Sequence, residues 1–159
     1  MSASFQIDEV FNVDVTHLFN HFKDPDKMRK WIYLDDFETS KIENNFSLDG
    51  SYSVTAPLPD GTPISWEGIY KSIRVDSYIE FTWTDSDIKD SIVKLKFVPQ
   101  GEHRTLLHLS HENFPDSKSM LEHKAIWLEN IQHLKEYVEN PLPVPKISEK
   151  SFDAGGAYY

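Results

Sequence analysis

The sequence contains no cysteine, which excludes disulfide bridges, thiol catalysis and cysteine-ligated zinc. Positive charge is also scarce. Sixteen lysines and arginines stand against 26 aspartates and glutamates, so the formal net charge is −10. Binding to nucleic acid or to anionic lipid headgroups requires clustered basic residues. We therefore expect neither nucleic acid nor a lipid surface among the partners of this protein.

Long apolar runs are missing as well. No run approaches the roughly 20 residues that span a bilayer, so no membrane span is expected. The first nine residues contain no basic stretch followed by an apolar one, which is the pattern of a signal peptide. The sequence thus predicts a cytoplasmic protein.

Aromatic residues, by contrast, are abundant. Ten Phe, seven Tyr and four Trp make up 13% of a chain of 159 residues, a length typical of one domain. Bulky core packing is the ordinary explanation for such a content, and an aromatic-lined cavity is the alternative.

Short segments with β-strand character are separated by turn signals such as Leu48-Asp49-Gly50 and Pro59-Asp60-Gly61. Because the breaks are short, they favour antiparallel hairpins over crossover connections. The predicted strands are Ser4–Val13, Glu38–Phe46, Ser51–Ala56, Ile64–Arg74, Tyr78–Thr84, Ser91–Val98 and Thr105–His111.

Three helices are predicted around these strands. Asp14 caps the first, Val15–Phe22, and Pro25 opens the second, which runs to about Trp31. A long helix follows from Ser117 to about Val138, with Ser119 as an alternative start. Its apolar stripe should cover the sheet, and it comprises Met120, Leu121, Leu128, Ile131, Leu134 and Val138, with Trp127 beside them. We expect a domain over residues 1–140 and a Pro-containing C-terminal tail over residues 141–159.

Alternation along the strands assigns an inner face, because lysines such as Lys94 and Lys96 mark the solvent side. The fold class is therefore α+β, with a curved antiparallel sheet of about seven strands around a long C-terminal helix. Two interpretations of the interior remain: a solid core, or a cavity for a small molecule. The predicted inner face collects Tyr52, Trp66, Tyr70, Phe81, Trp83, Phe97 and His111.

Five phrases carry a family resemblance: FNVDVTHLFNHFKDPDKMRKWI, LDGSYSVTAPLPDGTPISWEGIYKSI, DSYIEFTWT, HRTLLHLSHENFP and HKAIWLENIQHLKEYVE. In this order, over about Ser4 to Glu139, the chain resembles the SRPBCC superfamily of START-like, birch-pollen-allergen-like domains with the helix-grip fold. Within it, the chain is most similar to the branch named after the C-terminal domain of the activator of heat-shock protein 90 ATPase. Two departures are Asp49-Gly50, where the branch usually has Gly-Gly, and Ile126-Trp127, where it often has Gly-Trp.

The resemblance implies a pocket between the sheet and the C-terminal helix. Relatives bind lipids, sterols, hormones or polyketides, and a minority are enzymes. We therefore expect a binding domain for a small apolar or amphipathic molecule, monomeric or weakly dimeric, with no cofactor. The candidate ligand-binding residues are Trp31, Tyr52, Trp66, Tyr70, Phe81, Trp83, Phe97, His111 and Trp127.

Two alternatives stay open. An enzyme of the cyclase, dehydratase or hydrolase type would use His111 or Tyr70 as acid or base. A chaperone-partner module would need an exposed apolar patch. A metal site is not expected, because His17 and His21 stand one helical turn apart without a third ligand nearby. No catalytic residue is assigned.

Overall fold

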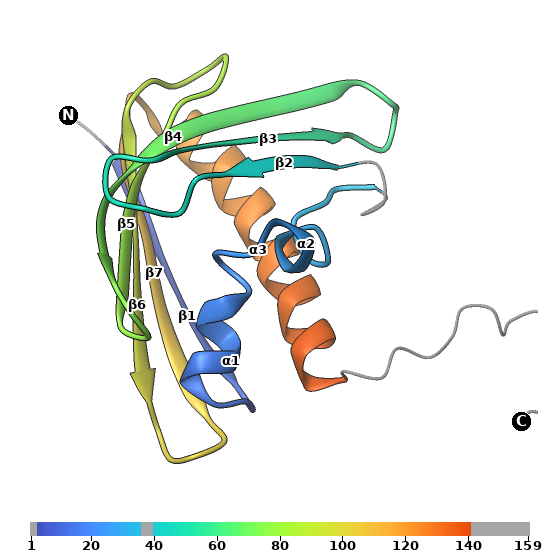
Figure 1. Ribbon diagram of the computed structural model, residues 1–159. Coiled ribbons are helices and arrows are strands. Elements are labelled where there is room, and N and C mark those ends of the chain that lie inside the picture. Colours follow the sequence, from blue (N-terminus) through green and yellow to red (C-terminus); the bar gives the residue numbers. More distant parts are fainter. Residues whose placement is uncertain (1–2, 36–39, 141–159) are drawn as a thin grey trace, which may run out of the picture.

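A computed structural model describes residues 3–35 and 40–140 of the chain. Within these residues, seven strands and three helices form an α+β fold, which confirms the predicted class (Figure 1). The strands are β1 (Ala3–Phe11), β2 (Lys41–Asn44), β3 (Ser51–Pro57), β4 (Pro63–Arg74), β5 (Tyr78–Trp83), β6 (Ser91–Pro99) and β7 (Thr105–Phe114). The helices are α1 (Val15–Asn20), α2 (Pro25–Met28) and α3 (Ser117–Glu139).

The seven strands form one antiparallel sheet in the order β1-β7-β6-β5-β4-β3-β2. Figure 1 shows the sheet curving around α3, with β2, β3 and the first half of β4 arching over the helix. Helices α1 and α2 lie on the same concave side as α3. The interior of the domain therefore lies between three parts of the chain: the concave face of the sheet, α3, and the segment that contains α1 and α2.

Inward residues of neighbouring strands stand directly opposite one another. One row crosses five strands, because the register pairs Phe5 with His111, His111 with Val93, Val93 with Phe81 and Phe81 with Tyr70. All five side chains are buried. The inner face predicted from strand alternation is thus confirmed.

The sheet bends sharply where β4 passes β5. Gly68 lies so close to the neighbouring strand that a Cβ atom there would collide with the carbonyl oxygen of Thr82. The pairing of the two strands also shifts register between Tyr70 and Ser72. A glycine at this position therefore permits the close backbone approach that folds the sheet over the helix.

The predicted helix boundaries need small corrections. Helix α3 begins at Ser117 as predicted, but Asp116 caps it by accepting a hydrogen bond from Ser119 N at 2.8 Å. The second helix is shorter than expected and ends at Met28. The strand predicted at 38–46 is confined to Lys41–Asn44 within the described residues, and residues 38 and 39 lie outside them.

The predicted apolar stripe of α3 was partly wrong. Leu121 and Leu128 are 58% and 48% exposed, whereas His123 and Asn130 are buried together with Trp127. The polar pair replaces the leucines on the inner face because each finds a hydrogen-bond partner there, as described below.

The predicted tail, 141–159, lies outside the described residues. No helix within the described part of the chain is both long and apolar enough to cross a membrane.

Candidate functional site

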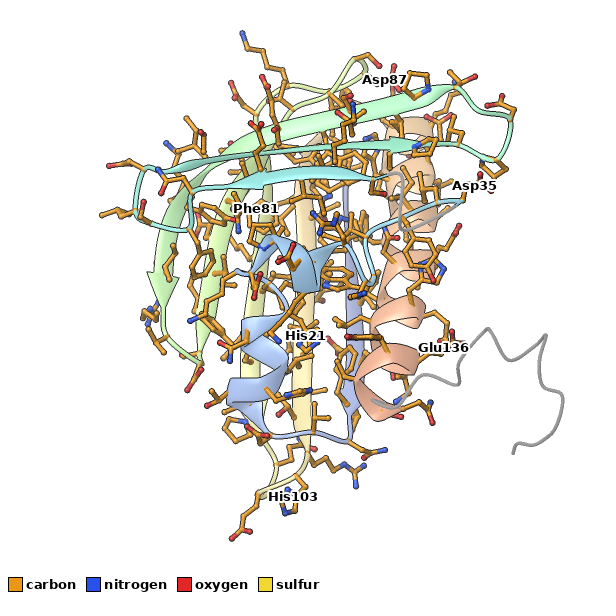
Figure 2. The ribbon with its side chains drawn as sticks, turned by 45° about the vertical axis from the view of Figure 1, so that its right-hand side comes forward. His21, Asp35, Phe81, Asp87, His103 and Glu136 are labelled. Atoms are coloured by element: carbon orange, nitrogen blue, oxygen red, sulfur yellow. The ribbon has the colours of Figure 1, made fainter. Side chains whose placement is uncertain are left out.

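A small cavity of about 40 Å³ lies between the concave face of the sheet, α3 and the α1–α2 segment. Every residue that lines it is buried. The labelled Phe81 marks its β5 side in Figure 2. The lining comprises Phe22, Met28, Trp31, Ile32, Tyr52, Val54, Trp66, Tyr70, Ile79, Phe81, Trp83, Leu95, Trp127 and Asn130.

Most of the candidate ligand-binding residues come together around this cavity. Those that line it are Trp31, Tyr52, Trp66, Tyr70, Phe81, Trp83 and Trp127. The structure places the other two elsewhere. Phe97 packs against Phe19 and Phe22 near α1, with ring centroids 5.2 and 5.3 Å apart, and His111 lies behind Trp83 and Trp127. Neither of these two borders the cavity.

The aromatic walls are packed ring against ring. The Trp66 and Trp83 rings stack with centroids 4.6 Å apart and an interplanar angle of 6°, and Trp127 follows at 5.7 Å from Trp83. Across the cavity, Phe81 meets Tyr52 edge-on at 5.2 Å. Such pairs add about 0.5–1.5 kcal/mol each beyond the burial of their area, so these contacts stabilise the walls of the cavity.

The tyrosine hydroxyls are used by the protein itself. Tyr52 Oη donates to the Thr82 carbonyl at 2.7 Å, at the sharp bend of β4. Tyr70 Oη donates to Asn44 Oδ1 at 2.6 Å, and burial raises the pKa of Tyr70 above its ordinary value. Both hydroxyls are therefore neutral structural groups at physiological pH.

His111 is held by a chain of hydrogen bonds. Trp127 Nε1–H donates to His111 Nδ1 at 3.1 Å, so Nδ1 is the unprotonated nitrogen and Nε2 carries the proton. Nε2–H then donates to Ser91 Oγ at 2.8 Å, and Ser91 Oγ–H donates to the Trp83 carbonyl at 2.7 Å. Burial, reinforced by the charge of His123, lowers the pKa of His111 to about 3. Both ring nitrogens are occupied, so His111 offers no free acid or base to the cavity.

The free energy of unfolding should depend on pH because His111 is neutral in the folded protein. The unfolded chain protonates His111 below about pH 6.5 while the folded chain does not, so stability falls as the pH drops from 6.5 toward 3. The slope from this one group approaches about 1.4 kcal/mol per pH unit. In urea denaturation, His111→Asn should be less stable than wild type at pH 7, and the gap should narrow by about 2 kcal/mol at pH 4.5. A gap that stays constant with pH would contradict the assignment.

A buried ion pair lies behind the tryptophan wall. His123 Nε2 is 2.6 Å from Asp85 Oδ2, and the two side chains are 4% and 5% exposed. Asp85 also accepts from Trp83 Nε1 at 2.9 Å and from the backbone N–H groups of Asp87 and Ile88 at 2.8 and 3.0 Å. His123 Nδ1–H donates to the Ser119 carbonyl at 2.7 Å. The pair fastens α3 to the loop that follows β5.

The geometry assigns opposite charges to this pair. Burial alone would favour the neutral acid, but the hydrogen bonds from His123, Trp83 and the backbone hold the pKa of Asp85 well below its usual range. Burial likewise opposes a charge on His123, yet its hydrogen bonds to Asp85 and Ser119 raise its pKa. Asp85 was missed in the sequence, where the only available signal was its place at the start of the turn Asp85-Ser86-Asp87.

Asn130 was also missed, because its position on the long helix gives no hint of its surroundings. It is 3% exposed, lines the cavity, and accepts a hydrogen bond from Tyr33 N through Oδ1 at 3.1 Å. This contact connects α3 with the chain that follows α2.

His17 and His21 are explained by packing. Their rings meet at 4.9 Å, and His21 Nδ1–H donates to the His17 carbonyl at 2.8 Å. Figure 2 shows His21 between α1 and α3, where burial lowers its pKa. Over residues 3–35 and 40–140, no group of three or more His, Cys, Asp or Glu side chains could hold a metal ion.

A curved antiparallel sheet closed around a C-terminal helix, with an aromatic cavity between them, defines the helix-grip class of α+β domains. A family model described as "Activator of Hsp90 ATPase homolog 1-like protein" matches residues 12–139, and the chain belongs to this family.

Solved structures support the same architecture. A protein from Chromobacterium violaceum has a TM-score of 0.74 and 19% identity, covering 86% of this chain and 97% of its own. An HSP90 activator from Plasmodium falciparum has a TM-score of 0.67 and 26% identity, covering 86% and 96%. CalU16 from Micromonospora echinospora has a TM-score of 0.71 and 16% identity, covering 93% and 81%. No curated protein matches the chain in sequence.

Proposed function

We propose that this domain binds a small, uncharged and largely apolar molecule between the sheet and α3. The observation that carries the proposal is the cavity lining. Among residues 3–35 and 40–140 it consists of aromatic and aliphatic side chains together with Asn130, without an aspartate, glutamate, lysine or arginine. Small-molecule sites have this composition, with few polar groups among apolar walls. A charged ligand would lose its hydration there without gaining a counter-charge.

The size of the cavity sets a condition on binding. About 40 Å³ is space for a few water-sized groups, so a larger molecule needs one wall to move. The sheet is joined by continuous strand pairing, and α3 is fastened by the His123–Asp85 pair. The wall formed by Phe22, Met28, Trp31 and Ile32 belongs instead to the segment that follows α1, in which only the four residues of α2 are helical. We expect this segment, residues 22–32, to move outward when a ligand enters.

Titration with the neutral fluorescent dye N-phenyl-1-naphthylamine tests the proposal. We expect saturable binding of one dye per chain, because the dye is uncharged and apolar. Val54→Phe fills the cavity and should weaken binding at least tenfold. Val98→Phe adds the same ring outside the cavity, on the face opposite to Phe97, and should leave binding unchanged. Absence of saturable binding, or equal binding by both variants, would refute the proposal.

A second candidate is a chaperone-related role. The likeness to the Plasmodium falciparum HSP90 activator favours it, and so do Leu121 and Leu128, which are exposed two turns apart on the outer side of α3. Its test is a pull-down with Hsp90, using Leu121→Ser/Leu128→Ser as the matched variant.

An enzymatic role has less support. Both ring nitrogens of His111 are hydrogen-bonded, and the Tyr70 hydroxyl donates a hydrogen bond to Asn44 Oδ1. General acid–base catalysis requires a titrating group within reach of the substrate.

A further inference from the structure

The cavity contains unused hydrogen-bond donors. Of the polar atoms on its walls, the tyrosine hydroxyls donate to Thr82 O and Asn44 Oδ1. The indole N–H groups of three lining tryptophans are also satisfied, since Trp31 donates to His21 O, Trp83 to Asp85 and Trp127 to His111. Two donors remain without an acceptor among the described residues: Asn130 Nδ2 and Trp66 Nε1.

The orientation of the Asn130 amide is fixed by its neighbour. Tyr33 N–H donates to Asn130 Oδ1 at 3.1 Å, so the oxygen faces the backbone and Nδ2 is the other end of the amide. The side chain as a whole is only 3% exposed and belongs to the cavity lining.

The nitrogen Asn130 Nδ2 keeps a small solvent-accessible area. In the described part of the chain, Ser40 Oγ is the one side-chain polar atom that is both sealed and unpartnered. Asn130 Nδ2 has no hydrogen-bond partner among the described residues and keeps some accessible surface, and its side chain belongs to the cavity lining. The Trp66 indole differs, because it also borders an open groove beside Ser65 and Thr84 where water can reach it.

We infer that the ligand of this cavity carries a neutral oxygen acceptor, such as a ketone, ester or ether oxygen, and that Asn130 Nδ2 donates to it. This inference rests on the proposed function and specifies the ligand class of the same site. A largely buried donor without an acceptor is unfavourable, and an acceptor oxygen on the ligand would satisfy it. A carboxylate is disfavoured because no lysine or arginine of the described residues lines the cavity.

The test compares two ligands of the same shape, cyclohexanone and methylenecyclohexane, in which a C=O group replaces C=CH₂. Both are titrated into wild type and Asn130→Leu by displacement of N-phenyl-1-naphthylamine. Comparing the ratio of the two affinities between wild type and Asn130→Leu cancels the difference in hydration between the ligands. We expect the ketone-to-alkene affinity ratio to fall about 3–10-fold in Asn130→Leu, the value of one neutral hydrogen bond.

A second variant and a direct measurement keep the test independent of folding. Asn130→Asp retains an acceptor for Tyr33 N–H but replaces the donor by oxygen, so the ratio should fall there too. In ¹⁵N–¹H spectra of the wild-type protein, the Asn130 side-chain amide should shift with cyclohexanone and much less with methylenecyclohexane.

The outcomes separate the two proposals. An unchanged affinity ratio, an amide that responds equally to both ligands, or dye binding that neither ligand displaces would overturn the acceptor inference and leave the binding site standing. Failure of the wild-type protein to bind the dye at all would overturn the binding site as well.

Discussion

Asp85→Asn should destabilise the fold by about 3–5 kcal/mol, although the change is nearly isosteric and removes a single charge. The carboxylate accepts from His123 Nε2 and Trp83 Nε1 through the same oxygen, Oδ2. An amide nitrogen at that position would face two donors, so at least one N–H group loses its acceptor. The loss should appear in urea denaturation as a lower midpoint with an unchanged m-value.

Asp87→Asn is the matched control, because Asp87 lies two residues away and its side chain is exposed. Its effect should stay within about 0.5 kcal/mol. Equal losses of stability in the two variants would show that the negative charge of the loop matters, and not the buried pair.

The deficit of Asp85→Asn should also depend on pH. The depressed pKa of Asp85 contributes stability above about pH 3.8, and this stability is lost as the pH falls through its folded pKa. The raised pKa of His123 contributes stability that is complete below about pH 6.5 and is lost as the pH rises through its folded pKa. The difference between wild type and Asp85→Asn should therefore be largest between about pH 4 and 6.5. A deficit that grows steadily above pH 7 would contradict a charged pair.

Trp31→Ala should cost about 3–5 kcal/mol, the usual effect of deleting a large buried aromatic side chain. The indole is 2% exposed, contacts the Phe22 ring in a tilted arrangement with centroids 4.9 Å apart, and donates to His21 O at 2.8 Å. Since Trp31 also forms part of the cavity wall, the variant should bind N-phenyl-1-naphthylamine faster than wild type. Denaturation and stopped-flow fluorescence measure the two effects.

Trp31→Phe keeps a six-membered aromatic ring but removes the five-membered part of the indole together with its N–H group. The loss combines a small cavity with the missing hydrogen bond to His21 O, so the expected cost is about 2 kcal/mol, well below that of Trp31→Ala. A dye association rate that stays the same in Trp31→Ala would argue against movement of the segment at residues 22–32.

Much of the fold could be read from the sequence, because strand alternation is a local property. Ile79, Phe81 and Trp83 share a face whatever lies beside them, and short turns leave antiparallel pairing as the simple solution. The long helix was found for the same reason, but its inner face was not. Leu121 and Leu128 fit the apolar spacing and are nevertheless exposed, while His123 and Asn130 point inward.

The sequence predicted most of the aromatic residues that surround the cavity, but not how their polar groups are paired. Most of the aromatic residues expected around the cavity line it, since parity assigns them to the concave face. His111 was placed correctly on that face, but its role depends on Trp127 and Ser91, which are 16 and 20 residues away along the chain. No local pattern reveals such partners.

The sequence by itself determined the α+β class, the order of the elements and the inward aromatic face, because these follow from local periodicity and turn chemistry. Only the tertiary structure decided which polar groups are satisfied. It paired Asp85 with His123, which is 38 residues away, and it gave both ring nitrogens of His111 a hydrogen-bond partner. It left Asn130 Nδ2 without an acceptor among the described residues. Hydrogen bonds between distant segments depend on where the folded chain brings them together, and the proposed acceptor group of the ligand rests on the unused donor that they leave at the cavity lining.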